Sequence, residues 1–233
     1  MEQVRTILLS QSVFENNDRE AEKLQEELTA KGVLLVNVMS SPGAGKTTTL
    51  IGLIRRLKEK YRIAVLEADI DSTVDAVSVA SQTGCTSVQL HTDGMCHLDA
   101  GMTRQGLDAL ELEQLDLIFL ENVGNLVCPA EYETGAQLSI TILSVPEGDD
   151  KPLKYPLVYE KCSLVLINKV DTLPYFDFDL DACKRNIGFR NPQAAVIPIS
   201  AKTGENMDQA AQYFSAAVEK CKERGKCQSK TKK

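Results

Sequence analysis

The chain has 233 residues, a formal net charge of −7 and 43% hydrophobic residues, which suits one compact globular domain. An acidic chain is a poor match for nucleic acid, because phosphates attract cationic surfaces. The sequence shows no apolar run long enough for a membrane span and no secretory signal, so we expect a cytoplasmic protein that binds neither membrane nor nucleic acid. Its seven cysteines are then expected to be thiols.

Continuously apolar runs alternate with helical patterns along most of the chain. Strands are predicted at Val33–Met39, Ile63–Glu67, Ser87–Leu90, Leu117–Glu121, Leu138–Val145, Leu164–Asn168 and Ala195–Ser200. Helices are predicted near Asp18–Ala30, Lys46–Lys60, Met102–Leu110, Asp179–Asn186 and Met207–Arg224, and the Pro- and Gly-bearing segment PEGDDKPLKYP is interpreted as a loop. The alternation predicts an α/β fold with a mostly parallel, doubly wound sheet flanked by helices, and ligands at the carboxyl ends of its strands.

A phosphate-binding loop follows the first predicted strand. The residues SSPGAGKT match the P-loop pattern, except that Ser40 occupies the usual first glycine position. The glycines let successive N–H groups point at phosphates, Lys46 reaches the β and γ phosphates, and the Thr47 hydroxyl binds Mg²⁺. The predicted nucleotide contacts in this loop are Pro42, Gly43, Ala44, Gly45, Lys46, Thr47 and Thr48.

Two later motifs indicate guanine. Asn168-Lys169-Val170-Asp171 follows the strand LVLIN, and the Asp171 carboxylate can accept two hydrogen bonds from guanine but not from adenine. The stem of Lys169 can lie along the base, and Asn168 can brace the surrounding loops. The segment Ser200-Ala201-Lys202 again follows a strand, and its backbone N–H groups can reach guanine O6. The order of these motifs favours GTP over ATP.

Acidic side chains at the ends of two strands are candidates for Mg²⁺ and for the switch regions. Either Asp69 or Asp75 could hold Mg²⁺ directly or through water, although acidic residues at such turns can also be simple helix caps. Glu121 ends the strand LIFLE, and Gly124 follows at the position of a γ-phosphate sensor. Asn125 stands where a water-positioning glutamine would, so we expect slow intrinsic turnover. The predicted catalytic residues are Lys46, Thr47, Asp69, Asp75, Glu121 and Gly124, of which Thr47, Asp69, Asp75 and Glu121 are the candidate Mg²⁺ ligands.

A cysteine and a histidine stand side by side at Cys96 and His97, in a chain with only two histidines. Thiolate and imidazole together suit zinc, nickel or copper. One such pair cannot complete a four-coordinate site, but two copies in a symmetric dimer could. Cys128 lies four residues after Gly124, where it could link nucleotide state to metal binding. From the residues alone, buried thiols and an ordinary histidine explain the pattern equally well.

The sequence resembles the hydrogenase nickel-incorporation GTPases of the HypB family, a group of SIMIBI-type P-loop proteins. The resemblance runs from Val33 to about Phe214 through SSPGAGKTT, ADIDSTVDA, DGMCHLDA, ENVGNLVCP, EGDDKPLKYP, NKVD and SAKTGENM. It implies that Cys96 and His97 bind nickel or zinc at a GTP-dependent homodimer interface, and that Cys128 takes part. It also implies GTP hydrolysis, delivery of nickel for [NiFe]-hydrogenase maturation, and contact with a nickel-transfer partner and other maturation proteins.

Some features depart from the family pattern. Asp93 and Met95 stand where relatives often have TGGGCHLDA, and the chain has neither an N-terminal cysteine motif nor a histidine-rich stretch for storing nickel. We expect a helical segment at residues 1–32, the P-loop GTPase domain at 33–220 and a flexible basic tail at 221–233. The alternatives are a urease-type nickel accessory GTPase, a regulatory GTPase with a structural zinc site, and a MinD-like ATPase. The absence of a Cys-Pro-His motif disfavours the first, and NKVD disfavours the last.

Overall fold

The computed structural model describes residues 9–69 and 73–231; Ile70, Asp71 and Ser72 of the ADIDSTVDA segment, the first eight residues of the predicted helical segment and the last two of the predicted tail lie outside it. Seven parallel strands form one sheet in the order β3-β2-β4-β1-β5-β6-β7. The strands are β1 (Leu34–Ser40), β2 (Ile63–Asp69), β3 (Thr86–His91), β4 (Leu117–Glu121), β5 (Leu138–Ser144), β6 (Leu164–Asn168) and β7 (Ala195–Pro198). All seven predicted strands are confirmed. Most are continuous apolar runs, as strands covered on both faces should be, whereas the edge strand β3 is only partly buried.

The longer helices are α1 (Leu9–Lys31), α2 (Lys46–Leu57), α3 (Val74–Thr83), α4 (Ala100–Leu107), α8 (Leu180–Arg190) and α9 (Met207–Thr231). Short helical turns are η1 (Leu112–Gln114), α5 (Cys128–Glu131), η2 (Val145–Glu147), α6 (Lys151–Lys154), α7 (Pro156–Lys161) and η3 (Val170–Tyr175). The five predicted helices are confirmed, and α3 is an addition. Its sequence, VDAVSVASQT, is rich in β-branched and small polar residues, which weaken the helical signal.

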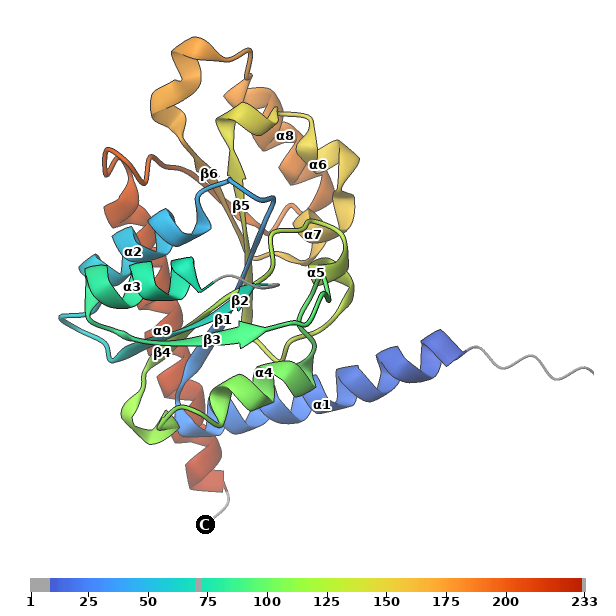
Figure 1. Cartoon of the computed structure of the whole chain (residues 1–233), viewed down its shortest axis with the longest axis vertical. Coiled ribbons are helices and arrows are strands. Elements are labelled where there is room, and N and C mark those ends of the chain that lie inside the picture. Colours follow the sequence, from blue (N-terminus) through green and yellow to red (C-terminus); the bar gives the residue numbers. More distant parts are fainter. Residues whose placement is uncertain (1–8, 70–72, 232–233) are drawn as a thin grey trace, which may run out of the picture.

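Helices cover both faces of the sheet (Figure 1). On one face, α2, α3 and α9 pack on a cluster that includes Val36, Phe119 and Phe214. The other face is divided: α1 and α4 cover the side of β2 and β4, and α5, α7 and α8 cover β5 and β6. This two-sided cover is the doubly wound arrangement that the sequence predicts, and it leaves the carboxyl ends of the strands free to carry the site.

The segment PEGDDKPLKYP is not a simple loop, contrary to the sequence-based interpretation. It contains the end of η2, all of α6 and the start of α7. Proline occupies the first or second position of all three elements. Proline is well tolerated there because the missing N–H would have no partner in the helix. The same residues that suggest a loop therefore start short helices.

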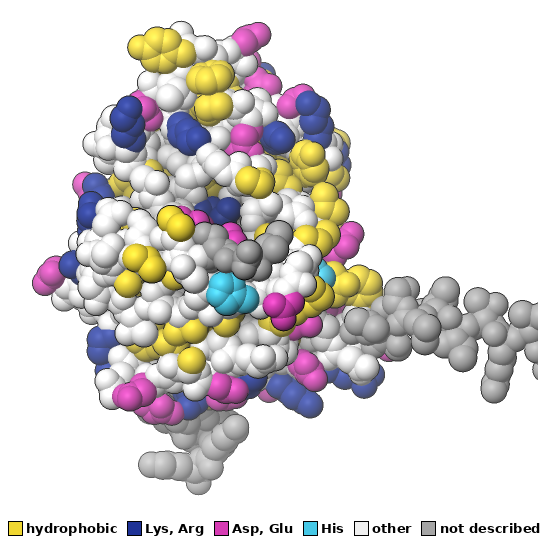
Figure 2. Space-filling model, in the orientation of Figure 1, with side chains coloured by type: hydrophobic (Ala, Val, Ile, Leu, Met, Phe, Trp, Pro, Cys, Tyr) yellow, Lys and Arg dark blue, Asp and Glu magenta, His cyan; other side chains and the backbone are white. Residues whose placement is uncertain are grey.

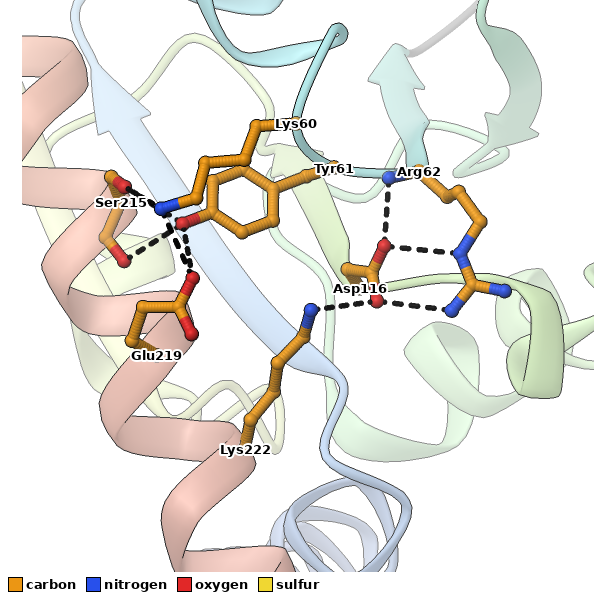
Figure 3. Close-up of polar contacts among 7 residues, drawn as sticks. All are labelled: Lys60, Tyr61, Arg62, Asp116, Ser215, Glu219 and Lys222. Carbon is orange, nitrogen blue, oxygen red and sulfur yellow. Dashed lines mark hydrogen bonds and ion pairs between the residues drawn. The ribbon is translucent and has the colours of Figure 1, made fainter.

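The end of α9 differs from the predicted flexible tail. The helix continues to Thr231, Cys221 is buried, and the Lys222 ammonium lies 3.0 Å from a carboxylate oxygen of Asp116 (Figure 3). Helix α9 also packs along α1. The two helices approach so closely that a Cβ on Gly225 would lie 2.5 Å from the backbone oxygen of Thr29. The basic composition of this segment reflects its exposed side, whereas the buried side joins it to the domain.

Asp116 is the centre of a group of polar contacts (Figure 3). It directly precedes β4 and therefore lies at the amino edge of the sheet, opposite the nucleotide motifs. Its carboxylate accepts hydrogen bonds from the backbone N–H of Arg62 at 2.8 Å and from the Arg62 guanidinium at 3.0 Å. Beside this group, the Tyr61 hydroxyl donates to Glu219 of α9 at 2.8 Å. These contacts tie the start of β2 and the residue before β4 to the last helix.

The surface carries charges of both signs. On the face drawn in Figure 2, lysine and arginine side chains are dispersed among acidic ones, in line with the acidic composition. Among the described residues, no helix has the length and apolar character needed to cross a bilayer.

Candidate functional site

The phosphate-binding loop connects β1 to α2 at the carboxyl edge of the sheet. Gly43 and Gly45 both have positive φ, at 75° and 94°, which favours glycine. A Cβ on Gly45 would lie 2.6 Å from Nδ2 of Asn168, so the position also lacks room for a side chain. Lys46 begins α2, and its ammonium donates to the hydroxyl of Ser40 at 3.1 Å. The serine that departs from the general P-loop pattern thus holds the loop's lysine.

The remaining predicted loop residues surround this turn. Ala44 is buried, Pro42 and Thr48 are exposed, and Thr47 is half-buried. Thr47 Oγ1 donates to Oε1 of Glu121 at 3.0 Å. Gly124 lies against Pro42, because a Cβ there would come within 3.1 Å of Pro42 Cγ. The phosphate loop is therefore in direct contact with the segment that follows β4.

The guanine motifs lie beside the same loop. Asn168 ends β6, donates to the carbonyl of Ala44 at 2.9 Å, and accepts from the N–H of Ala201 at 3.1 Å. Asn168 therefore links the phosphate loop to the Ser200–Lys202 segment. Lys169, with φ of 62°, donates to the carbonyl of Gly43 at 2.6 Å.

Asp171 is held by the motif that follows β7. The buried Ser200 hydroxyl donates to Asp171 Oδ1 at 2.6 Å, which fixes the carboxylate, while Lys202 is exposed. This arrangement brings an oriented acceptor and backbone N–H groups to one place. Such a pair of groups suits the edge of a guanine ring, which carries donors and an acceptor together.

Two buried carboxyl groups face each other beside the phosphate loop. Glu67 of β2 and Glu121 of β4 are paired in register on neighbouring strands, and they are 2% and 3% exposed. Burial and the nearby Glu121 charge raise the pKa of Glu67. Burial also raises the pKa of Glu121, against the opposing effects of Lys46 and Thr47. The pair therefore favours sharing one proton over holding two charges.

The carboxyl pair suits a divalent cation. Glu67 Oε1 and Glu121 Oε2 are buried and have no hydrogen-bond partner in the described part of the protein. Buried carboxylate oxygens without donors, next to a threonine hydroxyl, are the hard ligands that Mg²⁺ takes. Asp75, exposed in the first turn of α3, adds negative charge that raises the pKa of both glutamates. Asp69 ends β2 and is half-buried.

The structure brings Cys96 and Cys128 together, although 31 residues separate them. Their sulfur atoms are 2.8 Å apart. The hydrogen bond with Cys128, together with burial, raises the pKa of Cys96. Nδ1 of His97 lies 4.0 Å from the Cys96 sulfur. In the part of the chain that the structure describes, no three Cys, His, Asp or Glu side chains converge as a group that could hold a metal.

The imidazole of His97 stacks on Tyr132, with ring centroids 3.7 Å apart and planes at 16°. Tyr132 in turn contacts Phe14 of α1, with centroids 4.8 Å apart. Burial lowers the pKa of His97, so its neutral, metal-binding form is favoured at neutral pH. The chain therefore presents two close sulfur atoms and one oriented ring, fewer donors than a four-coordinate metal site needs.

Three residues at this site were not assigned a role from the sequence. Glu67 lies inside an apolar strand, the sequence marks Asn125 only as the residue in place of a glutamine, and Tyr132 lies outside every motif. The partners of each are distant in sequence: Glu121 for the first, Cys96 for the second, and His97 for the third. A charged residue within a buried strand was the one available signal, and it applies only to Glu67.

Comparison with known proteins identifies one family of similar chains. Residues 15–198 match the family model "CobW/HypB/UreG, nucleotide-binding domain". Hydrogenase maturation factor HypB of Escherichia coli K12 is 43% identical over 212 residues, which cover 90% of this chain and 72% of that protein. The crystal structure of HypB from Helicobacter pylori in complex with nickel aligns with a TM-score of 0.83 at 35% identity, covering 88% of this chain and 96% of that one. HypB from Archaeoglobus fulgidus aligns with a TM-score of 0.81 at 32% identity, covering 87% and 98%.

Proposed function

Because the chain belongs to the HypB hydrogenase maturation factors within the CobW/HypB/UreG family, we propose that it is a GTP-hydrolysing metallochaperone that delivers nickel for [NiFe]-hydrogenase maturation. The fold is the all-parallel α/β sheet of SIMIBI-type P-loop proteins. One observation carries the proposal. The segment that leaves β4 touches the phosphate loop through Glu121 and the paired cysteine through Cys128, so one piece of chain serves both sites.

The nucleotide is held by the phosphate loop and the two guanine motifs. The triphosphate lies along Pro42–Thr48, where Lys46 balances the β and γ phosphate charges. Asp171 accepts from the guanine N1–H and amino group, while Lys169 flanks the base and the Ser200–Lys202 backbone faces O6. The support for this pairing is that Ser200 already fixes the Asp171 carboxylate at 2.6 Å. A MinD-like ATPase would not need such a fixed acceptor.

Thr47 and Glu121 would hold Mg²⁺, with Asp69 or Asp75 as a further ligand, directly or through water. Mg²⁺ supplies charge neutralisation at the β and γ phosphates. In hydrolysis, the protein itself positions the phosphates through Lys46 and senses the presence of the γ phosphate through Gly124. Asn125, and not a water-positioning glutamine, directly follows Gly124, so turnover of the isolated protein is slow.

Cys96, His97 and Cys128 bind the transported nickel, and zinc competes for the same sulfur donors. The two close sulfur atoms support this role, because a soft or borderline divalent ion bridges neighbouring thiolates. One protomer offers too few ligands, so two protomers complete the site in a GTP-dependent homodimer. GTP hydrolysis then separates the two protomers, and nickel passes to an acceptor among the hydrogenase maturation proteins.

The proposed function also suggests how the chain is divided into segments. We assign residues 33–220 to the GTPase domain, residues 1–32 to an N-terminal helical segment whose described part is α1, and residues 221–233 to a basic C-terminal tail whose described part continues α9. The urease-type alternative is disfavoured by the likeness to HypB proteins. A regulatory GTPase with a structural zinc site is the alternative that experiment has to separate.

The test measures nickel affinity and molecular mass of the reduced protein, by chelator competition and light scattering, with GDP and with a non-hydrolysable GTP analogue. The proposal expects a dimer with the analogue and a nickel affinity that differs between the two states by about 5-fold or more. Cys96→Ser and Cys128→Ser should each abolish that difference. Cys227→Ser is the matched control, since Cys227 is exposed near the end of α9. A nickel affinity that ignores the nucleotide would favour the structural-zinc alternative.

A further inference from the structure

Asn125 lies between the phosphate loop and the paired cysteines. Its backbone forms an isolated antiparallel bridge with Ser40, the last residue of β1. Ser40 also accepts the hydrogen bond from the Lys46 ammonium. Ser40 therefore links Asn125 to Lys46, the lysine that we assign to the phosphates.

The side chain of Asn125 contacts the backbone beside the two cysteines. Its Nδ2 donates to the backbone carbonyl of Cys96 at 3.4 Å, and its Oδ1 accepts from the N–H of Val127 at 3.0 Å. Val127 immediately precedes Cys128. One amide thus holds the backbone next to both sulfur donors, and it joins two segments that are otherwise far apart in sequence.

Gly124, the residue before Asn125, packs tightly against the phosphate loop. Gly124 is so close to Pro42 that even a Cβ would lie 3.1–3.2 Å from its ring and backbone. A shift of the phosphate loop therefore has to move residues 124 and 125 with it, because close-packed contacts transmit displacement. The Cys96–Cys128 distance, now 2.8 Å, depends on the relative position of the two segments that Asn125 joins.

We infer that Asn125 is the positioning residue that couples nucleotide state to metal affinity, by carrying movement of the phosphate loop to the backbone of Cys96 and Cys128. This inference rests on the proposed function, since it requires that nickel affinity depends on the nucleotide. Coupling between two sites is reciprocal: nickel changes the affinity for the GTP analogue, relative to GDP, by the same factor by which replacing GDP with the analogue changes the affinity for nickel. Asn125 governs that factor without contacting either ligand.

The variants separate the two ends of the amide. Asn125→Ala removes both side-chain hydrogen bonds. Asn125→Asp keeps the acceptor for Val127 but loses the donor to Cys96, at nearly constant size. Val127→Ala is the matched control: it alters a side chain in the same turn, which is 48% exposed, and keeps the backbone N–H that Asn125 accepts.

The experiment measures six dissociation constants for each protein: nickel with GDP and with the analogue, and GDP and the analogue each with and without nickel. The first two give one coupling factor, and the last four give the same factor as a ratio. In Asn125→Ala and Asn125→Asp, both coupling factors should fall to within about 2-fold of unity, from about 5-fold or more in the wild type. Analogue affinity in the absence of nickel should stay within about 3-fold of wild type, and Val127→Ala should keep both factors.

Three results would overturn the inference. Coupling that persists in Asn125→Ala rejects Asn125 as the coupling residue and leaves the proposed function intact. Equal loss of nickel affinity with both nucleotides, or loss of nucleotide binding itself, shows that Asn125 merely supports the structure. A wild-type protein whose nickel affinity ignores the nucleotide rejects the inference together with the proposed function.

Discussion

Substitution of Asp116 by asparagine should destabilise the fold and leave nucleotide binding unchanged. The side chain is 10% exposed and accepts from the Arg62 backbone, the Arg62 guanidinium and the Lys222 ammonium (Figure 3). An asparagine at this position can still accept through one oxygen, but its NH₂ group would face the donors that the second oxygen now serves.

The magnitude follows from the burial of each contact. Loss of a charged acceptor from a mostly buried group costs about 1.5–3 kcal/mol. The Arg62 guanidinium is 60% exposed, so its ion pair adds only about 0–1 kcal/mol after solvent screening. We therefore expect Asp116→Asn to lower the free energy of unfolding by about 2–3 kcal/mol at pH 7, which corresponds to a Tm lower by roughly 4–12 °C for a chain of this size.

The loss should depend on pH in a defined direction. Burial alone would raise the pKa of Asp116, but the hydrogen bonds from Arg62 and Lys222 outweigh it and hold that pKa well below its ordinary value. Asp116 therefore stabilises the fold fully above the unfolded-state pKa, near 4, and this contribution disappears as the pH falls toward the depressed folded-state pKa. The difference in the free energy of unfolding between wild type and Asp116→Asn should be constant from pH 7 to 5 and shrink below about pH 4.

The assay is urea unfolding of reduced protein, followed by circular dichroism at several pH values. Asp208→Asn is the control, because Asp208 pairs with Arg56 but is 82% exposed and should change stability by less than about 0.5 kcal/mol. An Asp116→Asn variant that lowers the free energy of unfolding at pH 7 no more than the control does would refute the reasoning. A difference from wild type that widens as the pH falls would also refute it. GDP affinity, measured in parallel, should be equal in all three proteins.

Other substitutions test the sites themselves. Tyr132→Ala should weaken nickel binding by about 10–100-fold, because the ring that orients His97 is lost, while Tyr132→Phe retains it; equal chelator-competition curves for all three proteins would contradict this. Asp171→Asn should weaken GTP and favour xanthosine triphosphate, since an amide complements the altered edge of xanthine, and an unchanged preference in competition binding would remove Asp171 from the base pocket. Lys46→Ala should abolish phosphate release and preserve the circular dichroism spectrum; normal turnover would reject its assignment to the phosphates.

Local patterns predicted much of the fold. Most strands are continuous apolar runs, which identify covered strands without knowledge of their neighbours. The edge strand β3, TSVQLH, is the exception, because it is only partly buried. Helix α3 was missed because its β-branched and small residues carry little helical preference. The end of α9 was interpreted as a tail because its lysines dominate the composition, whereas its order comes from Cys221 and from the Lys222–Asp116 pair. Contacts of that kind join distant segments and leave no periodic trace.

The candidate site divides in the same way. The phosphate loop and NKVD are defined by spacing within a few residues, so the sequence reveals them directly. Glu67 pairs with Glu121 only because β2 and β4 are neighbours in the sheet, although many residues separate them. The roles of Asn125 and Tyr132 depend on the approach of the Cys96 segment, which is set by tertiary packing.

The crossing of α1 and α9 reverses a common rule of protein engineering. Replacing a glycine within a helix by alanine usually stabilises a protein by about 0.5–1 kcal/mol, through reduced freedom of the unfolded chain. Gly188 in α8 fits that rule, because a Cβ there meets no atom within 4 Å. At Gly225 the same methyl group would lie 2.5 Å from the Thr29 oxygen and push the two helices apart. A consensus of helix formers applied to α9 would therefore loosen the junction that fastens the last helix to the first.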